Sequence, residues 1–289
     1  MIFAGIYTAM VTPFRGGAVD WEALERLVEQ QIAAGVAGLI PVGTTGESPT
    51  LNYEEHAKVI SEVVRIAAGR CQVIAGTGSN CTAEAIELIR HAREAGADAC
   101  LQVTPYYNKP TPEGLFRHFA AIAEKGGLPV VLYNVPGRTG ISIPVDVIAH
   151  LSKLEMVQAV KEAAGSVERV SQILDACNIT VLSGDDSLFL PMMTAGARGV
   201  ISVASNIIPE RMVEMYKAWN SGAEAKAVAM HRRYYPLFRD LFIEANPIPV
   251  KEAMAHLGLI ALEYRLPLCE MSVEHREKLY KTMEQCLIP

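Results

Sequence analysis

Short apolar segments recur along the chain, and longer amphipathic segments separate them. Eight of these short segments begin 20 to 34 residues apart, close to the ~30 residues that a strand–helix–strand unit occupies. They are apolar throughout instead of alternating, which is typical of strands buried on both faces of a parallel sheet. The pattern therefore predicts strands at residues 5–11, 38–42, 72–76, 99–103, 129–133, 156–160, 179–183 and 199–203.

Helical periodicity fills the intervals between these strands, and cap residues mark two of the helices. Asp20 can cap a helix that runs to Ala34, and Thr82 can cap one that runs to Ala95. A glycine follows each of these segments and can end the helix. Eight strands alternating with eight helices predict a (β/α)8 barrel. A doubly wound open sheet is the alternative, although it usually carries a Gly-x-Gly-x-x-Gly loop that this sequence lacks.

The strand–helix alternation stops after about residue 224. The rest of the chain is expected to form helices, broken at residues 246–249 and near Pro267, where prolines interrupt the periodicity. We therefore expect a catalytic barrel over residues 1–224 and a helical C-terminal extension over residues 225–289. Because no Ser/Gly/Pro-rich linker separates the two parts, the extension is expected to pack on the barrel.

Composition and charge narrow the possible functions. Half of the 289 residues are hydrophobic and 20% are charged, so the chain can bury a large core and is not disordered. Its 26 basic and 32 acidic residues give a net charge of −6, without the basic surface that nucleic acid requires. No apolar run approaches the ~20 residues that span a bilayer, and the apolar N-terminus lacks the basic segment of a signal peptide. We expect neither nucleic acid nor a membrane as a partner.

Cysteine and histidine spacing adds two further expectations. The six cysteines form no Cys-x-x-Cys pair, and most lie in apolar segments. That pattern is typical of reduced, buried thiols, so we expect a cytoplasmic protein. None of the seven histidines has another histidine two to four positions away, so a local metal-binding motif is absent and we expect no metal.

A lysine ends one of the predicted strands. In a barrel of this type, the active site lies at the carboxyl ends of the strands and in the loops that follow them. Alternation places Val157, Ala159 and Lys161 on one face, with Val160 and Glu162 on the other. If the first face points inward, the amine stands in the barrel mouth, where burial favours the neutral form that can make an imine with a ketone. A snorkelling lysine, or one paired with Glu162, explains the position equally well.

Two neighbouring loops carry side chains suited to such chemistry. Tyr133 ends the preceding strand, and its hydroxyl could relay a proton. Arg138, in the loop above it, could hold a carboxylate bidentately. Thr44 and Thr45 lie in the loop at 43–48, which could bind a small anion but lacks the Gly-Lys-Ser/Thr ending of a P-loop. The structural alternatives are a packed barrel aromatic, a loop-ordering salt bridge and a simple strand-to-helix turn.

Two other loop segments have ordinary interpretations. The sequence Gly-Asp-Asp-Ser at 184–187 is expected to be an acidic N-cap for the next helix and not a metal site. The adjacent aromatics Tyr106 and Tyr107 follow the fourth predicted strand. Exposed aromatics on a loop often mark a subunit contact, and loop packing is the alternative.

Several of these segments together resemble the dihydrodipicolinate synthase family of pyruvate-dependent class I aldolases, to which N-acetylneuraminate lyase is also related. The resemblance covers essentially the whole chain. The most specific match is the Arg-Thr-Gly ending at 138–140, because sialic acid lyases differ there. The matching segments are Gly-Thr-Thr-Gly-Glu at 43–47, Tyr-Asn-Val-Pro-Gly-Arg-Thr-Gly at 133–140, the strand-end Lys161, and residues 184–186, 199–203 and 246–251.

The resemblance implies a mechanism that needs no organic cofactor. Lys161 would form a Schiff base with pyruvate. Thr44 and Thr45 would bind the pyruvate carboxylate, with help from the backbone of Gly184 and Ile201. The enamine would then add to L-aspartate 4-semialdehyde, in the first committed step of lysine and diaminopimelate synthesis.

The resemblance also implies an assembly. Tyr133 would shuttle protons and would be linked through Thr44 to Tyr107, which a neighbouring subunit supplies in the family. Arg138 would hold the carboxylate of the aldehyde substrate. Members of the family are typically homotetramers built as dimers of tight dimers.

A regulatory site is implied in the same way. Lysine-sensitive members carry a carboxylate at the position of Glu84, so L-lysine is an expected inhibitor. Pro49 and Tyr53 depart from the alanine and histidine that are common in the family. Glu84 also lies in the first turn of a predicted helix, where a carboxylate is favourable in any case. The matching allosteric positions are Ser48, His56, Asn80, Glu84 and Tyr106.

Three other functions compete with the synthase. A 2-keto-3-deoxy acid or N-acetylneuraminate aldolase would share Lys161 and Tyr133, but Arg138 favours a small second substrate with its own carboxylate. A non-catalytic barrel would be free to lose some of these side chains. A metal-dependent class II aldolase is disfavoured by the histidine spacing.

Overall fold

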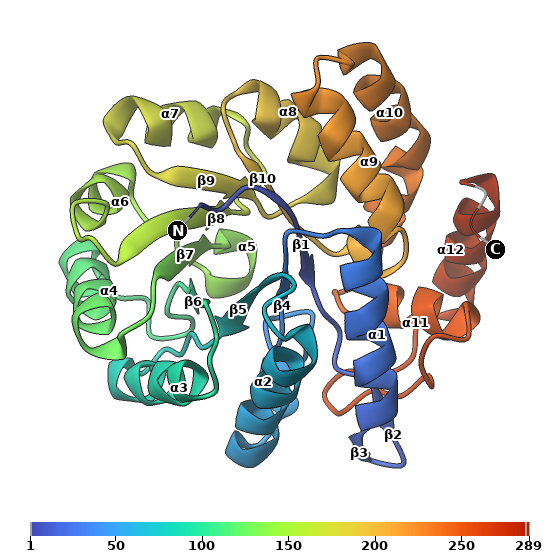
Figure 1. The fold of residues 1–289 in the computed structure, drawn as a ribbon, viewed down its shortest axis with the longest axis horizontal. Coiled ribbons are helices and arrows are strands. Elements are labelled where there is room, and N and C mark those ends of the chain that lie inside the picture. The colour runs from blue at the N-terminus through green and yellow to red at the C-terminus, as the bar shows by residue number, and fades with distance from the viewer. Residues whose placement is uncertain (1, 287, 289) are drawn as a thin grey trace.

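The computed structural model describes residues 2–286 and 288, and their centre is a closed barrel of eight parallel strands (Figure 1). The strands are β1 (Gly5–Ala9), β4 (Gly38–Ile40), β5 (Gln72–Gly76), β6 (Ala99–Val103), β7 (Val130–Asn134), β8 (Val157–Glu162), β9 (Thr180–Ser183) and β10 (Gly199–Ser202). Around the barrel they follow the order β1-β10-β9-β8-β7-β6-β5-β4. Each predicted strand overlaps one of these, so the predicted (β/α)8 barrel is confirmed.

Helices cover the outside of the barrel, one after each strand (Figure 1). They are α1 (Trp21–Ala34), α2 (Tyr53–Ala67), α3 (Thr82–Glu94), α4 (Pro112–Gly126), α6 (Val145–Leu151), α7 (Glu168–Ala176), α8 (Phe189–Thr194) and α9 (Pro209–Asn220). The loops after the strands contain α5 (Pro136–Thr139), η1 (Ser48–Thr50), η2 (Asp186–Leu188) and η3 (Ala204–Asn206). The loop after β1 also contains a hairpin of β2 (Phe14–Arg15) and β3 (Ala18–Val19), which the apolar pattern did not predict.

One of the two predicted helix caps is confirmed and the other is wrong. The Asp20 carboxylate accepts a hydrogen bond from the Ala23 amide at 3.0 Å, and α1 ends at Ala34 as predicted. Thr82 is instead the first residue of α3, which ends at Glu94. Its hydroxyl lies 2.9 Å from His118 Nδ1 on α4 and is therefore engaged in packing two helices together.

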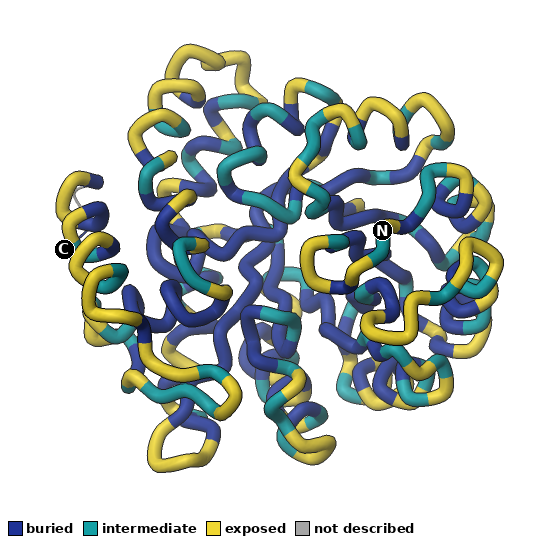
Figure 2. Tube along the Cα trace, turned by 180° about the vertical axis from the view of Figure 1, so that it is seen from behind, coloured by how far each residue is buried: buried dark blue, intermediate teal, exposed yellow. Residues whose placement is uncertain are grey.

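Apolar side chains form two layers, one inside the barrel and one between the strands and the helices. Buried residues accordingly fill the centre of the molecule, and exposed residues lie on the outer helices (Figure 2). Ala159 belongs to the inner layer and Val160 to the outer layer, as alternation predicts. Val157 belongs to the outer layer, contrary to the prediction. The reason is a register shift, in which Val130 pairs with Val157 but Val131 pairs with Ala159.

Three helices form the C-terminal extension, α10 (Glu224–Asp240), α11 (Ile248–His256) and α12 (Val273–Gln285). They lie on the side of the barrel where α1 and α9 are found (Figure 1). The predicted interruptions at residues 246–249 and near Pro267 fall at the start of α11 and between α11 and α12. The division into units at residues 1–224 and 225–289 stays a prediction.

The described residues also bear on the cysteines and on membrane association. All six cysteines are free, and Cys100 and Cys286 are buried. Cys81 and Cys269 are exposed, so the prediction of buried thiols is wrong for these two, which lie at the start of α3 and in the loop before α12. None of the described helices combines the length and the apolar composition needed to cross a membrane.

Candidate active site

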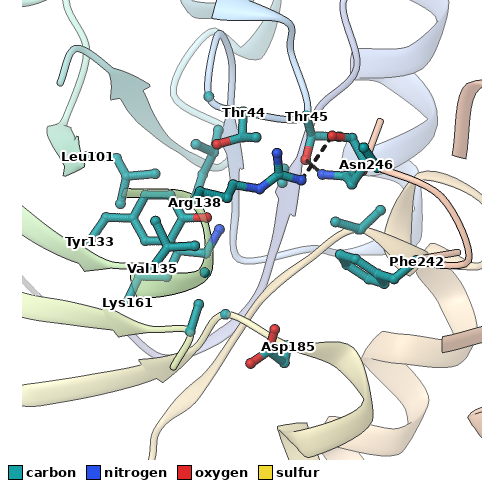
Figure 3. A pocket seen from close by; sticks show the side chains of 18 of the residues that line it. Thr44, Thr45, Leu101, Tyr133, Val135, Arg138, Lys161, Asp185, Phe242 and Asn246 are labelled. Atoms are coloured by element: carbon teal, nitrogen blue, oxygen red, sulfur yellow. Dashed lines mark hydrogen bonds between the residues drawn. The ribbon is translucent and has the colours of Figure 1, made fainter. Parts of the chain in front are cut away.

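A cavity of about 570 Å³ opens at the carboxyl ends of the barrel strands, where the fold predicts the active site (Figure 3). Loops from the barrel line most of it, and the segment between α10 and α11 closes one side. The lining side chains that carry polar groups are Thr44, Thr45, Tyr133, Arg138, Lys161, Asp185, Glu244 and Asn246.

Lys161 and Tyr133 face each other at the ends of two paired strands. They are register partners on β8 and β7, and Lys161 Nζ lies 4.2 Å from the centre of the Tyr133 ring. The two side chains are each only 6% exposed. The predicted alternative, a pairing of Lys161 with Glu162, is wrong because Glu162 points outward. Its carboxylate accepts two hydrogen bonds from Asn134 Nδ2, at 2.8 and 2.9 Å.

The absence of a side chain at Gly184 leaves space for the Lys161 side chain. A Cβ atom at this position would lie 2.5 Å from Ala163 Cβ and 3.1 Å from Lys161 Cε, and the first of these distances is a steric clash. The side chain of Ile201 is buried inside the barrel and does not line the cavity. Any contribution of Ile201 to a ligand would come from its backbone.

The two aspartates after Gly184 do not cap η2 with their side chains, contrary to the prediction. The Asp186 carboxylate instead accepts hydrogen bonds from the amides of Val203 and Ala204, at 3.0 and 2.8 Å. It thus ties the loop after β9 to the loop after β10. Asp185 lines the cavity, where burial raises the pKa of its carboxyl and the positive charge of Lys161 opposes that rise.

The loop that contains Thr44 and Thr45 is joined to the C-terminal extension. Asn246 Nδ2 donates a hydrogen bond of 2.9 Å to Thr45 Oγ1, and Arg138 Nη2 donates one of 3.0 Å to the Asn246 carbonyl. Figure 3 shows the Arg138 side chain reaching across the cavity toward Asn246. The predicted alternative, a salt bridge that orders the loop, is not what Arg138 makes here, since its partner is a carbonyl.

Tyr107 is the one candidate catalytic residue that the structure does not bring to the cavity of its own chain. It is 91% exposed and adopts a left-handed backbone conformation with φ of 71°. Tyr106 is 41% exposed. Both tyrosines therefore lie at the surface of the subunit, and the subunit contact expected there stays a prediction.

A second cavity of about 620 Å³ adjoins the first and shares Thr44, Tyr133 and Arg138 with it. Four of the five predicted allosteric residues line this cavity, and Asn80 lies beside it, donating a 3.2 Å hydrogen bond to the Tyr106 carbonyl. The lining allosteric residues are Ser48, His56, Glu84 and Tyr106.

The carboxylate of Glu84 accepts hydrogen bonds from the hydroxyls of Tyr53 and Ser79. Burial lowers the pKa of His56 to about 4, which leaves its ring neutral near pH 7. Glu84 supplies the carboxylate at this end of the second cavity. Over the part of the chain that the structure describes, no three His, Cys, Asp or Glu side chains are arranged to hold a metal ion.

A family model described as the dihydrodipicolinate synthetase family matches residues 2–286. The chain belongs to this family. Members are class I aldolase-type enzymes that work through a Schiff base, and the chain is an enzyme of this class. The non-catalytic barrel weighed on the sequence alone is therefore set aside.

Curated relatives in the family match along almost their whole length. A 4-hydroxy-tetrahydrodipicolinate synthase of Thermodesulfovibrio yellowstonii is 49% identical over 284 residues, which cover 98% of each chain. The protein of the same name from Methanocaldococcus jannaschii is 50% identical over 284 residues, again covering 98% of each chain.

Solved structures of the family superpose closely on the chain. The synthase of Methylacidiphilum fumariolicum SolV has a TM-score of 0.98 at 48% identity and covers 99% of this chain, which covers 96% of it. The Acinetobacter baumannii enzyme, described as complexed with pyruvate, has a TM-score of 0.96 at 45% identity, with 99% of each chain covered. The Cyanidioschyzon merolae enzyme, described as having lysine bound, has a TM-score of 0.96 at 39% identity, also with 99% coverage of each.

Asp185 and Asn246 both line the cavity, although the sequence indicates a catalytic role for neither of them. Acidic residues before a helix commonly cap it, so the local sequence indicates only a capping role for Asp185. Asn246 lies in the predicted helix break at 246–249 and in a segment that matches the family. Its polar side chain in the break between α10 and α11 is the available signal, but the chain offers no local reason for it to reach Thr45, which lies 201 residues away.

Proposed function

We propose that the protein condenses pyruvate with L-aspartate 4-semialdehyde through a Schiff base on Lys161, as a 4-hydroxy-tetrahydrodipicolinate synthase. The observation that carries this proposal is a buried lysine amine beside a tyrosine, in a cavity with two threonine hydroxyls and an arginine. The names of the relatives and the pyruvate described in the Acinetobacter baumannii structure support the same reaction.

In the first stage the Lys161 amine attacks the carbonyl carbon of pyruvate. The carbinolamine that forms loses water to give an imine, and loss of a methyl proton then gives an enamine. Both steps move protons close to the lysine nitrogen. The Tyr133 ring packs against this nitrogen, and its ionisable hydroxyl serves as the proton relay.

Thr44 and Thr45 are placed to bind the carboxylate of pyruvate. Thr45 Oγ1 accepts its hydrogen bond from Asn246, so the proton of the hydroxyl is free for an acceptor in the cavity. Backbone groups near Gly184 and Ile201 complete this part of the site in the proposal. Hydroxyl and amide groups donate hydrogen bonds to the carboxylate oxygens. The neighbouring ketone carbon then stays open to attack by the lysine amine.

Arg138 binds the second substrate, L-aspartate 4-semialdehyde, in this proposal. Its hydrogen bond to the Asn246 carbonyl uses one of five N–H donors, so the guanidinium can still bind the carboxylate of the aldehyde substrate. The enamine carbon attacks the aldehyde and forms the new carbon–carbon bond. The amine of the second substrate then attacks the imine carbon, closes the ring and releases Lys161 as a free amine.

Borohydride reduction tests the proposal directly. Protein mixed with pyruvate and then reduced is expected to carry a stable adduct on the peptide that contains Lys161, detectable by mass spectrometry. A folded sample without an adduct, or with the adduct on another lysine, would contradict the proposed nucleophile.

Tyr107 is proposed to complete the proton relay of a neighbouring subunit, in a homotetramer built from two tight dimers. Mixing Tyr107→Ala subunits with Lys161→Met subunits tests this arrangement. Each variant alone is expected to be nearly inactive. Randomly mixed dimers should regain about a quarter of wild-type activity, because half of them are hybrids with one complete site. Activity no higher than that of the separate variants would show that Tyr107 does not act across the interface.

L-Lysine is proposed to inhibit the enzyme from the second cavity, where the Glu84 carboxylate would bind its amine. The lysine described in the Cyanidioschyzon merolae structure supports this proposal. We expect Glu84→Ala to raise the half-inhibitory lysine concentration about 10- to 100-fold, the equivalent of losing one charge-assisted hydrogen bond.

Steady-state assays with increasing L-lysine measure the effect. Glu87→Ala, a matched substitution at an exposed position of α3, should leave inhibition unchanged. Equal sensitivity of wild type and Glu84→Ala, or an insensitive wild type at millimolar lysine, would contradict the proposed site.

A further inference from the structure

Lys251 on α11 and Glu47 form an ion pair behind the loop that contains Thr44 and Thr45. Lys251 Nζ lies 2.5 Å from Glu47 Oε1, and both side chains are completely buried. The ammonium group also lies 4.3 Å from the centre of the Phe14 ring. Neither charged residue lines either cavity, so the proposed chemistry does not use them.

Stability alone is a poor explanation for this pair. Two charges lose their hydration when they are buried, and their attraction often only balances that loss. Apolar side chains of similar size would often stabilise such a site equally well or better. An ion pair also favours a defined geometry, because separating the buried ammonium from the carboxylate would leave each charge without a partner.

The loop that the pair touches has a backbone that must be held in place. Val42 and Glu47 flank the four residues 43–46, and both have positive φ angles, 49° and 55°. Residues with a Cβ atom rarely adopt this backbone conformation, which persists only where surrounding contacts enforce it. Gly46 packs so closely that a Cβ atom there would lie 2.9 Å from the Val42 nitrogen. The conformation of the loop is therefore imposed by its surroundings.

Two of the contacts that impose it come from one segment of the extension. Asn246 holds Thr45 Oγ1 at 2.9 Å, and Lys251, five residues later, holds the side chain of Glu47. The first contact fixes the middle of the loop and the second fixes its end. Asn246 reaches the loop from within the cavity, whereas Lys251 reaches it from behind.

We propose that Lys251 is a positioning residue, which holds Glu47 and thereby keeps the loop in the conformation that presents the Thr44 and Thr45 hydroxyls to the pyruvate carboxylate. This inference rests on the proposed function of the first cavity. Without the pair, the loop would populate other conformations, and binding would have to select the competent one. The apparent affinity for pyruvate falls by the fraction of competent molecules, while later steps are unaffected once pyruvate is bound.

The decisive variant is the double substitution Lys251→Met with Glu47→Gln, because it leaves no unpaired charge in the interior. We expect the pyruvate concentration at half-maximal borohydride-trapped adduct, and the KM for pyruvate, to rise about tenfold or more. The kcat and the KM for the aldehyde should stay within about threefold of wild type. Glu47→Gln alone keeps an amide oxygen that can accept from Lys251, so its shift should be smaller.

A second ion pair on the same helix, between buried Glu252 and partly exposed Arg276, provides the control. Glu252 is 2% exposed, its carboxylate lies 3.0 Å from Arg276 Nε, and it faces α12 instead of the loop. Glu252→Gln with Arg276→Met removes an ionic contact of the same helix that does not involve the loop, so it should leave pyruvate saturation at the wild-type value.

Three results would overturn the inference. These are wild-type pyruvate saturation in the Lys251 and Glu47 double variant, equal shifts in the two double variants, and a fall in kcat without a change in the KM for pyruvate. If the wild type forms the pyruvate adduct, any of these three results contradicts only the role of Lys251 and not the proposed function. A wild type that forms no adduct would overturn both.

Discussion

Replacing Lys161 by methionine is expected to abolish the pyruvate adduct and to lower kcat by at least about 10⁴-fold. Lys161 and Arg138 are the basic side chains among the described residues that line the cavity, and a guanidinium does not form an imine under these conditions. Methionine keeps most of the volume of the side chain, so the barrel interior should remain packed.

The measurement combines steady-state kinetics with borohydride trapping on the same preparation. Lys153→Met, at an exposed position after α6, is the matched control and should retain wild-type kinetics. In Lys161→Ala, which leaves a space in the cavity, added small primary amines should restore part of the activity. An adduct that persists on another lysine in either Lys161 variant would refute the assigned nucleophile.

Replacing Arg138 by alanine is expected to lower kcat/KM for L-aspartate 4-semialdehyde about 10²- to 10³-fold, while adduct formation with pyruvate stays within about threefold of wild type. A bidentate arginine–carboxylate contact consists of two charge-assisted hydrogen bonds, whose combined loss accounts for such a factor. The first half-reaction should survive because Thr45 keeps its hydrogen bond from Asn246 when the arginine is removed.

Two controls separate substrate binding from loop order. Arg138→Lys keeps a positive charge without the planar fork, so it should recover only part of the lost activity. With a short aldehyde that has no carboxylate, wild type and Arg138→Ala should turn over at similar rates. Equal losses of adduct formation and of turnover in Arg138→Ala would instead indicate that the arginine orders the whole cavity through the Asn246 carbonyl.

Features that depend on short-range periodicity could be predicted without the structure. A parallel strand covered on both faces must be apolar along its length, so the eight runs and their spacing indicated the barrel. Asp20 caps α1 through an amide three residues away, which is a local interaction. Lys161 and Tyr133 were found because strands that end in one barrel mouth bring their terminal side chains together.

Interactions between distant segments could not be predicted in this way. The register shift that turns Val157 outward depends on how β7 and β8 pair, and Thr82 fails as a cap because its hydroxyl meets His118 on the next helix. Asp186 binds the amides of Val203 and Ala204 instead of its own helix. In each case a partner that only the folded chain supplies competes successfully with the local interaction.

The barrel, its strand ends and the chemical groups expected there thus follow from the order of residues along the chain, because strand and helix periods and parallel alignment suffice for these. The contacts by which the C-terminal extension supports the site become visible only in the folded chain. Asn246 and Lys251 meet Thr45 and Glu47 across 201 and 204 residues. No periodicity encodes such contacts, since they arise only when the barrel has closed and the extension has packed against it.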